Sequence, residues 1–212
     1  MRLLTVGDSF TYGDELGDLG LSWPNLLAKQ LGYDLLNLAK PGSGNTRMIR
    51  NSVENDADIT IVAWSHFARM EMADDEGIFD IWPGYHFDYR KDPNAHRQVA
   101  VNYVALHHND EYLYRQHLIN IILMQSYFKS QNKRYIMLDS FGNNKQYMTS
   151  RDTVKDLYKR IDSTCYLGWP YSTMMEWTYG AEQGPRGHFL EVGHKIVADK
   201  VYEHIRNLGW IS

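Results

Sequence analysis

Apolar residues follow two alternating patterns along this chain. Short apolar runs, typical of buried strands, predict strands at residues 3–6, 34–38, 59–64 and 135–139, with a further short strand at 164–167. Between the runs, apolar residues recur at helical spacing. That spacing predicts helices at residues 22–31, 45–55, 110–131, 151–161, 172–179 and 190–208. Strands that alternate with helices indicate βαβ units and therefore a parallel sheet with helices on both faces.

The predicted fold class is α/β, as a three-layer α/β/α sandwich around a flavodoxin-like parallel sheet of four to five strands. A chain of 212 residues fits one domain of this kind, over residues 1–212. Residues 66–109 break the alternation and are interpreted as an insertion. The insertion is rich in aromatic residues, namely Phe79, Trp82, Tyr85, Phe87 and Tyr89. We expect them to pack onto the sheet or to form a homo-oligomer interface, in preference to a dedicated sugar platform.

Charge and composition exclude several classes of partner. The net charge of −4 leaves no electrostatic footprint for nucleic acid, and no apolar run approaches the length of a membrane span. The apolar stretch after Arg2 is too short for a secretory signal, so Met1 is interpreted as the true start and a cytoplasmic location is expected. The single cysteine, Cys165, has no internal disulfide partner and is interpreted as a small buried apolar residue.

Polar residues and glycines stand where the first three predicted strands end. They occupy residues 8–9, 42–45 and 64–66. In open parallel sheets, ligands bind in the crevice at the carboxyl ends of the strands, so these segments are expected to converge there. A serine in that crevice acts as a nucleophile when a base takes its proton and N–H groups stabilise the oxyanion. Taken alone, Ser9 could also be a turn or N-cap residue.

Three segments resemble sequence blocks of the SGNH (GDSL) hydrolases. Residues 5–13, Thr-Val-Gly-Asp-Ser-Phe-Thr-Tyr-Gly, resemble block I, which carries the nucleophilic serine after the first strand. Residues 37–45 resemble block II, whose glycine amide helps to form the oxyanion hole. Residues 187–194 resemble block V, where the catalytic histidine precedes the last helix. The resemblance implies an ester hydrolase that needs no metal and no organic cofactor.

Carried onto this chain, the resemblance implies Ser9 as the nucleophile and His188 as the base. The amides of Ser9 and Gly42 would form the oxyanion hole, with Gly44 as the alternative to Gly42. The second histidine of block V, His194, is interpreted as a packing or hydrogen-bonding residue.

Block III departs from the family's pattern. The family has an asparagine there whose side chain donates to the oxyanion, and residues 63–69 contain none. We expect Ser65 or His66 to donate instead, since the resemblance is to divergent members, many of them phage-encoded, that tolerate such a swap.

Block V departs as well. The family's acid lies two or three residues before the histidine, where this chain has Arg186 and Pro185, neither of which can orient an imidazole. We expect the acid to come from elsewhere, with Glu182 and Glu176 nearest in the sequence, or a Ser–His dyad completed by a backbone carbonyl.

Four residues beside these positions are candidates for substrate contacts: Asp8, Asn45, Trp64 and Arg69. For Asp8 the alternative is a role in shaping the turn through its own hydrogen bonds, and for Arg69 it is a surface ion pair. A metal site at His107 and His108 is not expected, because adjacent side chains point in different directions.

Together these features predict a serine esterase acting on a small acyl ester, with the O-acetyl group of a carbohydrate as the favoured substrate. The departures in blocks III and V favour one alternative. It is a catalytically weak or inactive SGNH-like module that binds carbohydrate or builds an assembly, such as a virion component.

Overall fold

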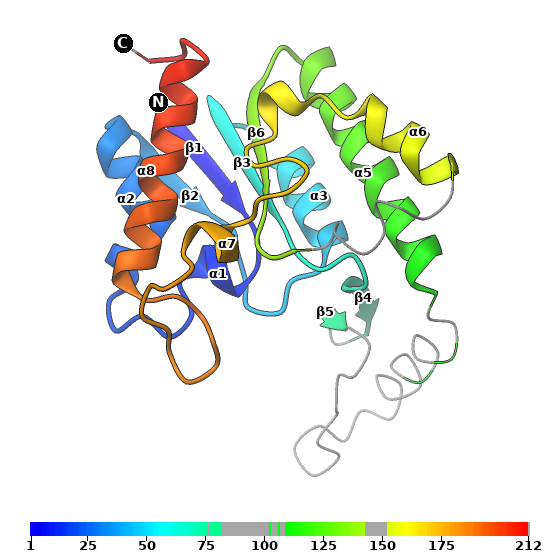
Figure 1. Ribbon diagram of the computed structural model, residues 1–212, viewed down its shortest axis with the longest axis horizontal. Helices are drawn as coiled ribbons and strands as arrows, with labels where there is room; N and C mark the ends of the chain where they lie inside the picture. Colours follow the sequence, from blue (N-terminus) through cyan, green and yellow to red (C-terminus); the bar gives the residue numbers. More distant parts are fainter. Residues whose placement is uncertain (76, 82–101, 103–105, 107–108, 143–151, 212) are drawn as a thin grey trace.

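The computed structural model describes residues 1–75, 77–81, 102, 106, 109–142 and 152–211. Its centre is a parallel sheet in the order β2-β1-β3-β6 (Figure 1). The four strands are β1 (Arg2–Val6), β2 (Asp34–Asn37), β3 (Ile59–Trp64) and β6 (Arg134–Asp139). β1 and β3 occupy the middle of the sheet, where both faces are covered, and this explains their continuous apolar runs. The predicted flavodoxin-like α/β sheet is therefore confirmed.

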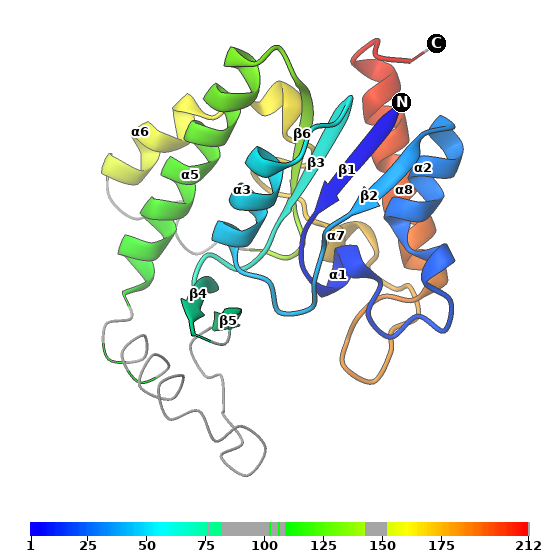
Figure 2. The ribbon, with the colours of Figure 1, turned by 180° about the vertical axis from the view of Figure 1, so that it is seen from behind.

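Helices cover both faces of the sheet (Figures 1 and 2). On one face lie α2 (Trp23–Leu31) and α8 (Glu191–Asn207), which pack against each other. On the other face lie α3 (Asn45–Glu54) and α5 (Asp110–Ser130), and α6 (Asp152–Arg160) packs on α5. Each layer buries an apolar helix stripe against the strands, as the helical spacing predicted.

Shorter elements gather at the carboxyl end of the strands. They are α1 (Ser9–Tyr12), α7 (Met174–Trp177) and an antiparallel hairpin of β4 (Met70–Asp74) and β5 (Gly77–Ile81). Figure 1 shows α1 beside the loop that leads into α8, at the opposite end of the sheet from the N-terminus. Residues far apart in the sequence thus meet at this edge.

Two local predictions were wrong. Residues 164–167 form no strand: the Asp162 side chain accepts a hydrogen bond from Thr164 N (2.9 Å) and turns the chain. A 3-10 turn (Ser163–Cys165) follows, and Tyr166 makes only an isolated bridge to Met137. The helix expected at 172–179 is only the four residues of α7: Thr173 N donates to the Glu176 carboxylate (3.0 Å) at its start, and Gly180 turns the chain after it with a left-handed φ of +84°.

The insertion begins with the β4–β5 hairpin, in which Phe79 lies opposite Met72. The other aromatic residues of the predicted cluster, Trp82, Tyr85, Phe87 and Tyr89, lie outside the described residues, as do His107 and His108. In the described part of the chain, no helix is both long and apolar enough to cross a membrane.

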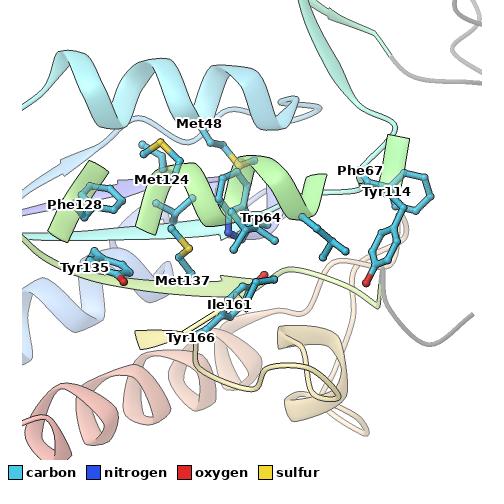
Figure 3. Packing of buried hydrophobic residues seen from close by; sticks show 14 of the residues in the cluster. Met48, Trp64, Phe67, Tyr114, Met124, Phe128, Tyr135, Met137, Ile161 and Tyr166 are labelled. Carbon is cyan, nitrogen blue, oxygen red and sulfur yellow. The ribbon is translucent and has the colours of Figure 1, made fainter. Parts of the chain in front are cut away.

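Two apolar clusters fill the space on either side of the sheet. Leu3, Trp23 and Phe189 belong to the cluster beneath α2 and α8. Figure 3 shows the other cluster, where Trp64 and Met137 of the strands meet side chains of α3 and α5. All five of these side chains are fully buried, so each contributes roughly 1.5–3 kcal/mol to folding.

Candidate active site

Ser9 stands on a sharp turn at the carboxyl end of β1. The turn needs glycine at position 7, because a Cβ there would lie 2.2 Å from Thr11 Oγ1. Asp8 then caps α1, with its Oδ1 accepting a hydrogen bond from Phe10 N (3.1 Å). Ser9 is the first residue of this helix, so its own amide is not needed within the helix.

Asp8 is completely buried beneath that turn. Besides Phe10 N, its carboxylate accepts a hydrogen bond from Ser140 Oγ (3.1 Å) and lies 3.6 Å from the Arg69 guanidinium. Burial raises the pKa of the Asp8 carboxyl, while the charge of Arg69 and the hydrogen bonds oppose that rise. Asp8 therefore anchors the nucleophile turn, and the expected substrate contact by this residue was wrong.

His188 is held in a tight loop before α8. Gly184 N donates to His188 O (2.8 Å), and Leu190 N donates to Glu182 O (2.9 Å), so the two sides of the loop pair with each other. Gly187 has φ +84°, a left-handed conformation that favours glycine, and it turns the chain immediately before His188.

The imidazole of His188 bridges a hydroxyl and a carboxylate. Its Nε2 lies 2.8 Å from Ser9 Oγ, and its Nδ1 lies 2.8 Å from Glu15 Oε2. An ionised carboxylate can only accept, so Nδ1 carries the proton and Nε2 is left as the acceptor for the Ser9 hydroxyl. The Phe10 ring packs against the imidazole, with 4.7 Å between ring centroids. A hydroxyl, an imidazole and a carboxylate joined in this order can generate a nucleophilic oxygen.

Glu15 follows α1 with a left-handed φ of +73°, which is uncommon for a residue other than glycine. Its side chain is 7% exposed. Besides the ring, it accepts hydrogen bonds from Arg186 N (2.8 Å) and His188 N (3.2 Å). Burial by itself would raise the pKa of Glu15, but these hydrogen bonds lower it below the ordinary value. The carboxylate is therefore ionised at neutral pH.

The carboxylate beside His188 is thus neither of the two expected from the sequence. The Glu176 carboxylate accepts a hydrogen bond from Thr173 N (3.0 Å) at the start of α7. Glu182 is exposed and lines a cavity of about 290 Å³ together with Glu15 and Leu16. The expectation of Glu182 or Glu176 was wrong because the loop before α8 closes onto the turn after α1.

Arg186 is one of the two residues at which the family's acid was expected, and its guanidinium pairs with the turn that carries Glu15. Its guanidinium lies 2.8 Å from Asp14 Oδ1 and 3.8 Å from Glu15 Oε1. The one sequence signal for this arrangement was the acidic pair Asp14-Glu15 after Gly13, whose partner can be known only from the folded chain.

The segment at residues 40–44 lies against the nucleophile turn, since Lys40 N donates to Gly7 O (3.2 Å). Gly42 has φ +78°, which favours glycine. The amide of Gly44 donates to Asp80 Oδ1 (2.9 Å) and is therefore already engaged. Of the two glycines considered for the oxyanion hole, the structure thus favours Gly42.

Ser65 and Asn45 are buried together behind this edge. Ser65 is fully buried, and its amide donates to Asn45 Oδ1 (2.9 Å). Asn45 Nδ2 lies 3.3 Å from His117 Nδ1, and Asn45 is only 4% exposed. Ser65 is fully buried and both ends of the Asn45 amide are engaged inside the protein, so a substrate contact by Asn45 and an oxyanion contact by Ser65 do not fit this geometry.

His66, the other candidate from block III, is partly exposed. Its Nδ1 accepts a hydrogen bond from Ala68 N (3.2 Å), so the proton of the neutral ring lies on Nε2, where it is a donor. The ring stacks near Phe141, at 6.3 Å between centroids, and Phe141 in turn packs on Phe10.

Trp64 and Arg69, the two remaining candidates for substrate contacts, lie in different surroundings. Trp64 is fully buried in the apolar cluster beneath α5, as Figure 3 shows, so its expected substrate contact was wrong. It faces α5 because alternate side chains of a strand point to opposite faces. The Arg69 guanidinium lies over the Phe141 ring at 5.3 Å and 3.6 Å from the buried Asp8 carboxylate, so Arg69 is ion-paired, but not at the surface as its alternative role assumed.

His194, the second histidine of block V, has a structural role. Its Nδ1 accepts a hydrogen bond from Trp23 N (3.1 Å), and burial lowers its pKa to about 3. It therefore ties α8 to the start of α2 as a neutral ring.

Solved structures that share this fold include the following three proteins. TesA aligns with a TM-score of 0.56 and 16% identity, over 98% of this chain and 99% of TesA. The psychrotrophic esterase EstA from Pseudoalteromonas sp. aligns at 0.54 and 10%, over 98% and 97% of the two chains. A family two carbohydrate esterase from Clostridium thermocellum, solved in complex with cellohexaose, aligns at 0.54 and 12%, over 99% and 65%.

These likenesses show that the chain has the fold of the SGNH (GDSL) hydrolases, as the sequence blocks predicted. By sequence, the chain belongs to the family of unknown function DUF6071, whose model matches residues 16–212. That match includes His188 and begins directly after Glu15. No curated protein sequence matches the chain.

Proposed function

We propose that this protein is a serine esterase in which Ser9 is the nucleophile, His188 the general base and Glu15 the acid that orients the histidine. The observation that carries the proposal is the continuous hydrogen-bond chain from Ser9 Oγ through both ring nitrogens of His188 to Glu15 Oε2. Each link has the length of a good hydrogen bond, and the lowered pKa of Glu15 keeps its end of the chain charged.

In the first half of the reaction, Ser9 Oγ attacks the acyl carbon and its proton moves to His188 Nε2. The protonated imidazole is stabilised by the Glu15 carboxylate. The same proton then passes to the alkoxide of the leaving alcohol, and the acyl group remains on Ser9. In the second half, water attacks the acyl carbon while His188 takes its proton, and the acid product leaves as Ser9 recovers a proton.

The oxyanion of each tetrahedral intermediate would be stabilised by N–H donors around Ser9. We assign this role to the amides of Ser9 and Gly42 and to the Nε2–H of His66, which would replace the family's asparagine. Donors fixed in place before the reaction stabilise developing charge without reorganisation.

The favoured substrate is a small acyl ester, in particular an O-acetyl group on a carbohydrate. Two observations support this choice. The fold is shared with the family two carbohydrate esterase that was solved with cellohexaose. In addition, the Phe10 ring packs on the imidazole of His188 and on the Phe141 ring, so an apolar surface lies beside the proposed base.

The test is acetate release from 4-nitrophenyl acetate and from acetylated xylo- and cello-oligosaccharides, with wild type and Ser9→Ala compared. Turnover by the wild type that Ser9→Ala abolishes supports the esterase. Binding of the acetylated oligosaccharides without acetate release, by a folded wild-type protein, would instead indicate a non-catalytic carbohydrate-binding module.

A further inference from the structure

The β4–β5 hairpin brings two carboxylates together on one face. Glu71 and Asp80 are direct cross-strand neighbours, and their side chains are only 11% and 5% exposed. Like charges directly opposite each other destabilise a hairpin, and burial increases the penalty. A pair of this kind is stable only if something outside the hairpin compensates it.

The compensation comes from α3. Arg47 inserts between the two acids, with its Nε 3.2 Å from Glu71 Oε2 and its Nη2 2.9 Å from Asp80 Oδ2. Arg50 forms two further hydrogen bonds to Glu71 (3.0 and 2.9 Å), and Lys40 lies 3.6 Å from Asp80. The hairpin is therefore attached to α3 by a mostly buried ion-pair network.

One contact of this network reaches the peptide backbone beside the proposed oxyanion hole. Asp80 Oδ1 accepts the hydrogen bond of Gly44 N (2.9 Å), at the start of α3. The backbone of Met70, on the other strand, passes so close that a Cβ on Gly44 would lie 2.7 Å from it. Both strands of the hairpin thus hold Gly44 in place.

The segment that contains Gly42 is consequently fixed at both ends. At its start, Lys40 N donates to Gly7 O (3.2 Å), next to the nucleophile turn. At its end, Gly44 is bound by Asp80. Between them, Ser43 N donates to Lys40 O (3.1 Å) and closes a turn around Gly42. The direction of the Gly42 amide therefore depends on both attachments.

We infer that Asp80 is a positioning residue: by binding the Gly44 amide, it orients the segment whose Gly42 N–H stabilises the oxyanion. This inference rests on the proposed esterase function. It assigns a role in catalysis to the insertion, which from the sequence was expected only to pack onto the sheet or to form a homo-oligomer interface. Such a residue should act on the chemical step and leave substrate binding almost unchanged.

The experiment compares three hairpin variants in acetate release. Asp80→Ala should lower kcat by about 10- to 100-fold with KM changed less than about twofold. Asp80→Asn keeps an acceptor for Gly44 N and should recover most of the loss. Glu71→Ala is the matched control, because it removes another largely buried carboxylate from Arg47 but leaves the bond between Asp80 and Gly44. Equal losses in Asp80→Ala and Glu71→Ala, or an unchanged kcat in Asp80→Ala, would overturn the inference.

Hydrogen exchange of residues 40–46 gives a readout that needs no activity. Asp80→Ala should exchange faster in this segment than wild type and Glu71→Ala; unchanged exchange would refute the positioning role even if the protein hydrolysed no ester. Should Asp80→Ala not fold, Asp80→Glu keeps the charge for Arg47 but shifts the carboxylate by one methylene. It is then expected to lower kcat, and an unaltered kcat and exchange rate would count against the inference.

Discussion

His188 Nδ1 lies 2.8 Å from Glu15 Oε2, across 173 positions of sequence. The carboxylate therefore comes from the turn directly after α1, the short helix that begins with Ser9, and not from the loop that carries the histidine. The two positions at which the SGNH family's acid was expected hold Pro185 and Arg186, and Arg186 pairs with Asp14 and Glu15.

The role of Glu15 can be separated from that of its neighbour. Glu15→Gln should lower kcat by about 10²- to 10⁴-fold, because the imidazole loses the partner that sets its tautomer and stabilises its charge. The measurement is the steady-state rate of acetate release with KM determined in parallel. Asp14→Asn is the matched control: it weakens the contact with the same Arg186 but leaves His188 untouched, and its kcat should stay within about twofold of wild type. Comparable losses in both variants would argue against an orienting role for Glu15.

The donor role of His66 predicts a difference between two substitutions. His66→Phe keeps a ring that stacks near Phe141 but removes the N–H, so kcat should fall by about 10- to 10³-fold. His66→Gln retains an N–H donor and should lose less. Rate constants for both variants, measured with the same acetyl ester, decide the point. Identical activity of His66→Phe and wild type would remove His66 from the oxyanion hole.

The buried histidines predict a loss of stability at acidic pH. Burial lowers the pKa of His117 and of His194 to about 3, so between pH 6.5 and 3 the unfolded chain binds protons that the folded chain does not. Stability should therefore fall on acidification through this window, by at most about 1.4 kcal/mol per pH unit for each ring. Urea unfolding at several pH values measures it. His194→Gln should show a shallower slope, and a slope equal to that of wild type would contradict the assignment of a neutral ring.

The contact between Gly44 and Met70 predicts a stability difference between two glycines. Gly44→Ala places a methyl group against backbone atoms that cannot easily move, and should destabilise the protein by roughly 1–3 kcal/mol. Gly17→Ala meets nothing within 4 Å and should change stability by less than about 0.5 kcal/mol. Chemical denaturation of the two variants provides the comparison. Equal stability of both would mean that the hairpin does not press on Gly44.

Much of the fold was predictable because strand and helix periodicities are local. The strands β1, β2, β3 and β6 lie within one residue of the predicted runs, and their parallel arrangement follows from the alternation with helices. The serine turn and the loop before α8 were placed by motifs that are equally local. Asp162 changed one of the shorter elements because its side chain competes with regular backbone hydrogen bonds.

The contacts within the site were less predictable, since they depend on which loops meet. Glu15 becomes the partner of His188 only when the loop at 182–190 closes onto the turn after α1. Trp64 was placed at the right strand end, but the pleat of β3 directs it into the core. Asn45, expected at the surface, instead joins block II to block III through the Ser65 amide. In each case a long-range contact decides the role of the residue.

The most direct test of the proposed mechanism is labelling by a fluorophosphonate, which reacts covalently with an activated serine oxygen. The proposed mechanism predicts one phosphonyl group per chain on the peptide that contains Ser9, identified by mass spectrometry, and no labelling of Ser9→Ala. A folded wild-type protein that stays unlabelled, or a Ser9→Ala variant that is labelled as fast as wild type, would contradict it.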